Sequence, residues 1–200
     1  MKAFLLIFLA VLLYGVLHSW LASLWLKARA RRLLGLVSDR WYRLSYNLLA
    51  ILTLLPVLAL PVMLEDHQYY QVPAPWRFVM LGGQALAALT LLVGLWQTDI
   101  WSFLGLRQML FGAQPKPPRL VVGGLYRWVR HPLYSAGLAF IWLMPVMTRN
   151  LLAFNLGITI YIVLGAWLEE QKLLLEFGDA YRQYRRKTAM LIPGFRWPFR

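Results

Sequence analysis

Long apolar runs separated by short polar and basic segments dominate this chain. The run at residues 3–26 can cross the roughly 30 Å hydrocarbon layer as a helix, because a helix rises about 1.5 Å per residue. It is also longer than the apolar part of a signal peptide, which is about 7 to 15 residues. We therefore predict five membrane-spanning helices, at residues 3–26, 44–64, 76–96, 132–147 and 151–168.

The fourth apolar run is the shortest. As a helix, residues 133–147 would extend about 22 Å, which is less than the hydrocarbon thickness. This segment therefore either enters the bilayer partway or is completed by helical residues before Pro132. The short turn at residues 148–150 leads into the fifth run, so we expect the last two spans to pack antiparallel.

The basic residues divide unequally between the two sides of this arrangement. Of the 21 Lys and Arg residues, 18 lie in segments that would face one side, and only Lys2, Arg77 and Arg149 would face the other. Basic segments remain on the cytoplasmic side of a membrane protein. The N-terminus is therefore predicted outside and the C-terminus inside, with a cytoplasmic C-terminal helical segment after residue 168.

Composition agrees with a membrane protein. The 200 residues are 60% hydrophobic and 14% charged, and their mean hydropathy is +0.55. These values indicate one all-α polytopic membrane domain over residues 1–200 rather than a soluble globular fold. The net charge of +13 would suggest nucleic-acid binding in a soluble protein, but here it follows the membrane topology. The sequence has no cysteine and predicts no metal site.

Chemically versatile residues gather at the inner ends of the predicted spans. Arg130, His131 and Tyr134 lie where the fourth span begins, and Glu169 and Glu170 lie where the fifth ends. Antiparallel packing would bring these two groups to the same height. Adjacent helical residues point about 100° apart, so one glutamate can face the hairpin and the other the C-terminal segment. The connector after the third span contributes a further polar group, Gln97, Asp99, Arg107 and Gln108.

Two explanations fit the cluster around Arg130. In the first, Arg130 pairs with one glutamate to hold the hairpin together, and the tyrosines anchor the chain in the interface. In the second, the cluster binds a ligand that carries both an ammonium and a carboxylate, with Arg130 contacting the carboxylate bidentately. Two adjacent carboxylates, an imidazole and several phenols exceed what one ion pair needs, which favours the second explanation.

These residues also carry a family resemblance. The strings GLY at 124–126, RHPLY at 130–134, EE at 169–170 and FGDAYRQY at 177–184 resemble the signature of integral-membrane methyltransferases. The group includes isoprenylcysteine carboxyl methyltransferase and phospholipid N-methyltransferases, which use S-adenosylmethionine. More narrowly, the chain is similar to the bacterial methanethiol S-methyltransferase group, through HSWLAS at 18–23, YN at 46–47, SFLGLRQ at 102–108 and MLIP at 190–193.

The resemblance implies a cofactor-binding core at residues 123–193, with S-adenosylmethionine held at the inner ends of the last two spans. It implies catalytic roles for Arg130, His131 and Glu170, and His131 could act as a base or only contact the cofactor. His18, Asn47 and Gln108 are candidate substrate contacts. The motif assigns cofactor binding to Tyr126, Arg130, His131, Pro132, Tyr134, Gly137, Glu169, Glu170, Tyr181 and Tyr184.

The expected function is transfer of a methyl group from S-adenosylmethionine to a small or lipophilic acceptor. Preference for a thiol rests on the resemblance alone, and a phospholipid amine or an isoprenylcysteine carboxylate is the alternative. We expect the site at the cytoplasmic face of a bacterial inner membrane, in contact with membrane lipids. Neither a nucleic acid nor a protein partner is inferred.

Two further classes of membrane protein stay open as alternatives. NnrU-like membrane proteins and a haem-dependent carotene isomerase belong to the same broad grouping, and haem ligation would favour paired histidines within the membrane. In this sequence only His18 is predicted to lie within the membrane, because His67 falls in an outer loop and His131 at the inner edge of a span. A membrane scaffold or small transporter is the other alternative, but the sequence lacks the internal repeat typical of transporters.

Overall fold

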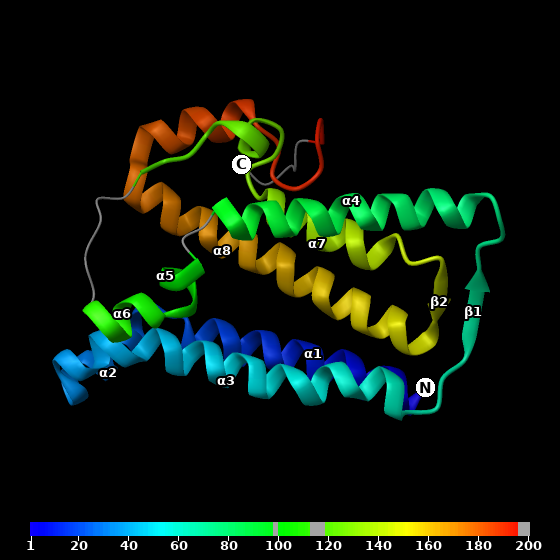
Figure 1. Ribbon diagram of the computed structural model, residues 1–200, viewed down its shortest axis with the longest axis horizontal. Helices are drawn as coiled ribbons and strands as arrows, with labels where there is room; N and C mark the ends of the chain where they lie inside the picture. Colours follow the sequence, from blue (N-terminus) through cyan, green and yellow to red (C-terminus); the bar gives the residue numbers. More distant parts are fainter. Residues whose placement is uncertain (98–99, 113–118, 196–200) are drawn as a thin grey trace. The chain divides into compact units, whose positions relative to one another are not determined.

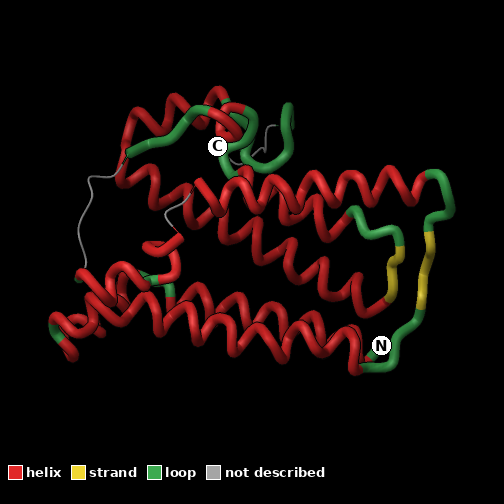
Figure 2. Tube along the Cα trace, viewed as in Figure 1, coloured by secondary structure: helices red, strands yellow, loops and turns green. Residues whose placement is uncertain are grey.

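The computed structural model of this protein is almost entirely helical, and it describes residues 1–97, 100–112 and 119–195 (Figure 1). Asp99, one of the predicted polar residues, lies outside these ranges. Among the described residues, strands are confined to a short antiparallel pair (Figure 2). The elements are α1 Lys2–Leu21, α2 Leu24–Leu34, α3 Leu36–Met63, β1 Gln68–Gln71, α4 Trp76–Gln97, α5 Ile100–Leu104, α6 Leu106–Phe111, η1 Gly124–Arg127, α7 Pro132–Trp142, β2 Val146–Thr148 and α8 Arg149–Lys187.

Four of the helices are long and apolar enough to cross a membrane. They are α8 and the stretches Lys2–Leu21, Arg40–Met63 and Trp76–Trp96 of α1, α3 and α4. Helix α7 is also apolar, but it has only 11 residues. The chain is therefore an integral membrane protein, while the count of five spans and their orientation stay predictions.

Two predicted span boundaries are wrong. The first span ends at Leu21 rather than at residue 26, because Ser23 accepts a hydrogen bond from the Leu26 N–H at 3.2 Å and caps the new helix α2. The fourth apolar helix ends at Trp142 rather than at residue 147. Its expected last turn is instead the strand Val146–Thr148, which pairs with β1. Both breaks lie inside uninterrupted apolar runs, where hydropathy does not reveal them.

Contacts between residues divide the chain into two compact units. Helix α8 supplies its first turns to the first unit and the rest to the second. The first unit is Met1–Gln71, Leu95–Lys116 and Val146–Ile158, and the second is Val72–Gly94, Pro117–Pro145 and Thr159–Arg200. The single-domain organisation expected from the sequence stays a prediction.

In the first unit, a small apolar cluster joins α1, α3 and the start of α8. Ile7, Val11, Val57 and Ala153 are buried together. A Cβ atom placed on Gly157 would lie 2.8 Å from a Val11 methyl carbon, so only glycine permits this close approach of α8 to α1.

Asn150 fixes the beginning of α8 to the loop that follows α3. Its side chain is fully buried, and its Nδ2 lies 3.1 Å from the Leu64 carbonyl and 3.3 Å from the carbonyls of Pro61 and Glu65. These carbonyls belong to the frayed end of α3, where backbone acceptors lack helical partners. One amide group therefore supplies donors to the Pro61 and Leu64 carbonyls, and the Glu65 carbonyl also accepts from Arg149 Nη2 at 3.1 Å.

Asp66 also links the beginning of α8 to the loop that follows α3. Its carboxylate accepts hydrogen bonds from the backbone N–H groups of His67 at 2.8 Å and Asn150 at 3.0 Å. Burial would raise the pKa of Asp66, but hydrogen bonds from Thr148, Asn150 and His67, together with the charge of Arg149, outweigh burial and lower this pKa. The carboxylate at the start of α8 also complements the positive end of the helix dipole.

In the second unit, α7 lies against α4 and α8. A Cβ atom on Gly83 would come 2.7 Å from the Leu143 side chain, so glycine allows the approach of α4. The Trp142 indole N–H donates to the Thr159 hydroxyl oxygen at 2.9 Å and joins α7 to α8. These contacts set α7, which carries the RHPLY string, beside the part of α8 that carries the two glutamates.

We expect Asn150→Ala to destabilise the protein, because the carbonyls of Pro61 and Leu64 would lose their side-chain donor. The cost of such a loss is about 1–3 kcal/mol, which corresponds to several degrees in the thermal unfolding midpoint of a chain this size. The measurement is thermal unfolding in detergent, with the exposed Gln71→Ala in the neighbouring strand as the control. Equal midpoints for the two variants would contradict the role given to Asn150.

Candidate functional site

The residues before α7 form an extended stretch that pairs with the segment after α8. Val129 bridges Ala189 in a parallel arrangement. The Arg130 N–H donates to the Ala189 carbonyl at 2.8 Å, and the His131 N–H donates to the Met190 carbonyl at 3.2 Å. Pro132 then begins α7, where a missing N–H costs nothing. The two ends of the sequence motif are therefore held side by side through their backbones.

Side chains reinforce this pairing. Thr188, Ala189, Met190 and Leu191 are each less than a tenth exposed. Met190 and Leu191 pack with Ala166 of α8 in a buried cluster. The MLIP string thus packs against α8 and covers the polar residues between α7 and α8.

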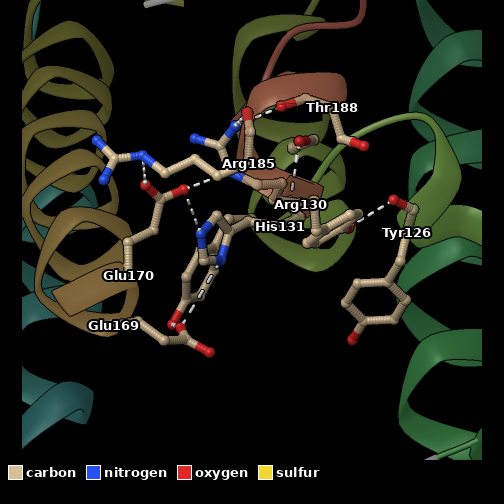
Figure 3. A network of polar contacts seen from close by, with 10 residues as sticks. Tyr126, Arg130, His131, Glu169, Glu170, Arg185 and Thr188 are labelled. Atoms are coloured by element: carbon tan, nitrogen blue, oxygen red, sulfur yellow. Dashed lines mark hydrogen bonds and ion pairs between the residues drawn. The ribbon is translucent and has the colours of Figure 1, made fainter. Parts of the chain in front are cut away.

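Arg130 lies at the centre of the polar network. Its Nε donates to Glu170 Oε1 at 2.6 Å, and its Nη1 donates to the carbonyls of Arg185, at 3.1 Å, and Thr188 (Figure 3). The side chains of Arg130 and Glu170 are only 8% and 2% exposed. One guanidinium therefore joins the start of α7, the middle of α8 and the segment after α8.

Glu170 is shared by several neighbours. Besides its bond to Arg130, its Oε1 lies 3.4 Å from His131 Nε2, and its Oε2 lies 3.4 Å from Arg185 Nε. Dashed lines in Figure 3 run from this one carboxylate to all three side chains. The carboxylate is thus buried among two guanidinium groups and an imidazole.

Glu169 faces different neighbours. The Tyr134 hydroxyl donates to Glu169 Oε2 at 2.9 Å, and His131 Nδ1 lies 3.8 Å from the same oxygen. The rings of His131 and Tyr134 stack, with centroids 5.4 Å apart and planes 17° apart. The Glu169 side chain is 46% exposed, against 2% for Glu170. The two adjacent glutamates therefore diverge, as the angular step of a helix predicts.

Tyr181 and Tyr184 reach the network because α8 breaks at Gly178. This glycine has a φ of 52°, a left-handed conformation that side chains disfavour. Beyond the break, the Tyr184 hydroxyl donates to the Tyr126 carbonyl at 2.6 Å, and the Tyr181 ring packs edge-on against Tyr184 at 5.9 Å. The Tyr181 side chain is fully buried.

Tyr126 and Gly137 complete the predicted set. Burial raises the pKa of the Tyr126 phenol, and the negative charge of Glu169 raises it further, so the phenol is a hydrogen-bonding group rather than a base. A Cβ atom on Gly137 would meet nothing within 4 Å, so the space beside this residue of α7 is open. The structure brings all ten predicted cofactor residues into the second unit, and their roles stay predictions.

The three predicted substrate residues belong to the first unit. His18 of α1 lies close to α3, with its Nε2 at 2.5 Å from the Tyr46 hydroxyl, and Asn47 is the next residue of α3. Gln108 of α6 donates from Nε2 to the Ser102 carbonyl at 3.2 Å. Their roles also stay predictions.

Sequence reasoning missed two contributors to the network. Arg185 directly follows Tyr184 of the motif and its guanidinium contacts Glu170, but its residue type alone indicates only a basic residue on the inner side. Thr188 contributes a main-chain carbonyl to Arg130, and a carbonyl leaves no trace in residue type.

Comparison with known protein families then assigns the chain. Residues 80–179, half of its length, match the family described as Phospholipid methyltransferase. The chain belongs to the phospholipid methyltransferase family. The matched residues run from α4 to just beyond Gly178 and include both glutamates. No solved structure matches the chain.

Several similar proteins bear the name methanethiol S-methyltransferase. One from Bradyrhizobium diazoefficiens is 44% identical over 96 residues, which cover 46% of this chain and 34% of that protein. One from Mycobacterium tuberculosis is 35% identical over 130 residues, 64% of this chain and 50% of that protein. One from Crocosphaera subtropica is 31% identical over 192 residues, 90% of this chain and 71% of that protein. The chain thus spans half or less of the first two relatives.

Replacing Arg130 tests whether the buried ion pair holds the site together. We expect Arg130→Ala to lower the thermal unfolding midpoint in detergent with no ligand added, because breaking a buried pair costs about 3–5 kcal/mol. The control is Arg127→Ala, since Arg127 is exposed and lies over the Trp128 ring. A midpoint for Arg130→Ala as high as that of the control would show that the network contributes nothing to folding.

Proposed function

We propose that this protein is a membrane methyltransferase that transfers the methyl group of S-adenosylmethionine to a small thiol. The observation that carries the proposal is the position of Glu169, Glu170 and Arg130, which form one polar site between α7 and α8 in a chain of the phospholipid methyltransferase family. Methanethiol is the preferred acceptor, because the relatives described above bear that name.

The residues at this site fit such a donor. When bound, S-adenosylmethionine supplies an electrophilic methyl group on a sulfonium and carries an amino-acid end with an ammonium and a carboxylate. Glu169 keeps a half-exposed carboxylate that accepts one hydrogen bond from Tyr134 and has capacity for an ammonium. The open space beside Gly137 lies on the same helix as Tyr134. The residues proposed to form the donor site, by direct contact or by holding the contacting groups in place, are Tyr126, Arg130, His131, Pro132, Tyr134, Gly137, Glu169, Glu170, Tyr181 and Tyr184.

The proposed catalytic residues contribute position more than proton transfer. In-line transfer needs the reacting atoms about 3–3.5 Å apart, so a rigid frame supplies much of the rate. Arg130 and Glu170 provide that frame because both are buried and bonded to each other. His131 lies between the two glutamates and stacks on Tyr134, a setting that suits a binding contact. Transfer forms the new S–CH3 bond on the thiol sulfur, breaks the sulfonium S–CH3 bond of the donor and releases the thiol proton, and the thiolate is the reactive form.

We assign His18, Asn47 and Gln108 to the acceptor side. His18 of α1 and Tyr46 of α3 form a hydrogen-bonded pair, and polar groups within membrane helices commonly serve function. Asn47 continues this polar surface on α3, and Gln108 lies in the same compact unit.

The membrane arrangement completes the proposal. We propose one domain with five spans, the N-terminus outside, the C-terminus inside and the site at the cytoplasmic face of a bacterial inner membrane. The distribution of basic residues supports this orientation, since 18 of the 21 fall in the segments placed inside. Helix α7 would be the fourth span, and its 11 residues cross only part of the hydrocarbon layer.

The function is tested by supplying methyl-labelled S-adenosylmethionine and methanethiol to the purified protein and measuring labelled dimethyl sulfide in the gas phase. We expect turnover by the wild type, a loss of about a hundredfold or more for Glu169→Gln, and near-normal turnover for Glu176→Gln, an exposed control on α8. Label in phosphatidylethanolamine but not in the thiol would favour the phospholipid alternative. A haem absorption band without binding of S-adenosylhomocysteine would favour the NnrU-like alternative.

The acceptor side is tested through Tyr46. We expect Tyr46→Phe to raise the KM for methanethiol several-fold and leave the KM for S-adenosylmethionine unchanged, because the hydroxyl partner of His18 is removed. Thr53→Ala is the matched control, since that hydroxyl bonds only carbonyls of its own helix α3 at 2.7 and 3.2 Å. An unchanged KM for the thiol in Tyr46→Phe would exclude this pair from the acceptor site.

A further inference from the structure

The two arginines that contact Glu170 are held very differently. Arg130 donates to Glu170 at 2.6 Å and also to the carbonyls of Arg185 and Thr188, and its side chain is 8% exposed. Arg185 contacts the other oxygen of Glu170 at 3.4 Å through its Nε, and its side chain is 22% exposed. A charge-assisted hydrogen bond is usually about 2.7–2.9 Å long, so the Arg185 contact is loose.

This difference decides which guanidinium can exchange partners. If Arg130 turned to a ligand, the buried Glu170 carboxylate and two main-chain carbonyls would lose a donor, and each loss carries a desolvation cost. If Arg185 turned to a ligand, Glu170 would keep its short bond to Arg130. Arg185 is therefore the guanidinium whose contact with Glu170 a ligand can replace while the Arg130–Glu170 bond stays intact.

Arg185 contacts Glu170 because the chain folds back within α8. Residues 170 and 185 are 15 positions apart, and a straight helix would separate them by about 22 Å along its axis. The break at Gly178, with its φ of 52°, reverses the end of α8 so that Arg185 contacts Glu170. Arg130 then fixes the returning turn through the Arg185 carbonyl at 3.1 Å.

We propose that Arg185 binds the carboxylate of the donor's amino-acid end, and that Arg130 is a positioning residue that holds Glu170 and the Arg185 backbone in place. The proposal rests on the proposed function. It divides the zwitterionic end of the donor between two partly exposed side chains, with the ammonium on Glu169 and the carboxylate on Arg185 (Figure 3). A planar guanidinium suits a carboxylate because it can donate two parallel hydrogen bonds.

The experiment compares two ligands that differ only in the part Arg185 would recognise. S-Adenosylhomocysteine carries the amino acid, whereas 5′-methylthioadenosine keeps the nucleoside and thioether without it. Binding of each to the purified full-length protein in detergent is measured by calorimetry for the wild type, Arg185→Gln and the exposed neighbour Arg186→Gln. We expect Arg185→Gln to weaken S-adenosylhomocysteine about tenfold or more and methylthioadenosine less than about twofold, and Arg186→Gln to change neither.

Other outcomes overturn the proposal. Unchanged affinity of Arg185→Gln for S-adenosylhomocysteine would show that Arg185 does not contact the ligand, and an equal loss for both ligands would make its role purely structural. If Arg185→Gln does not fold, Arg185→Lys decides in its place, because it keeps the charge without the planar fork. A selective loss of S-adenosylhomocysteine in Arg185→Lys supports the proposal, and an unchanged ratio of the two affinities rejects it. A wild type that binds neither ligand would reject the proposed function itself.

Discussion

The ion pair between Arg130 and Glu170 joins three parts of the second unit that are distant in sequence. Its two side chains are almost completely buried, and the same guanidinium also bonds the carbonyls of Arg185 and Thr188. A buried pair of this kind gives little net stability, since both charges must leave water. What it provides is a fixed geometry, because His131 and Arg185 both lie directly against Glu170.

Two neighbouring carboxylates have separate tasks in this geometry. Glu170 is inaccessible and belongs to the frame, whereas Glu169 is half exposed and lies against Tyr134 and His131. The two explanations of the cluster that the sequence left open are therefore compatible. One glutamate pairs with Arg130 as a structural hairpin would require, and the other keeps a carboxylate that a cationic group can approach.

Sequence reasoning located the polar site and most of the helices because both depend on regular spacing. Apolar runs mark helices of known rise, and two adjacent glutamates must diverge on any helix. It misplaced the ends at Leu21 and Trp142, because a side-chain cap at Ser23 and a strand pairing with residues 68–71 act without changing hydropathy. It also missed Arg185, since contact with Glu170 depends on a single backbone conformation at Gly178.

The parallel pairing of residues 129–131 with 189–191 has a consequence for biosynthesis. The backbone acceptors that receive Arg130 and His131 follow the four long apolar helices in the order of synthesis. Those helices can therefore enter the bilayer before the polar network exists, and the buried charges are fixed only once residues 185–191 have been made. A chain interrupted before residue 188 would insert its apolar helices but would lack the backbone that holds Arg130 and His131 in place.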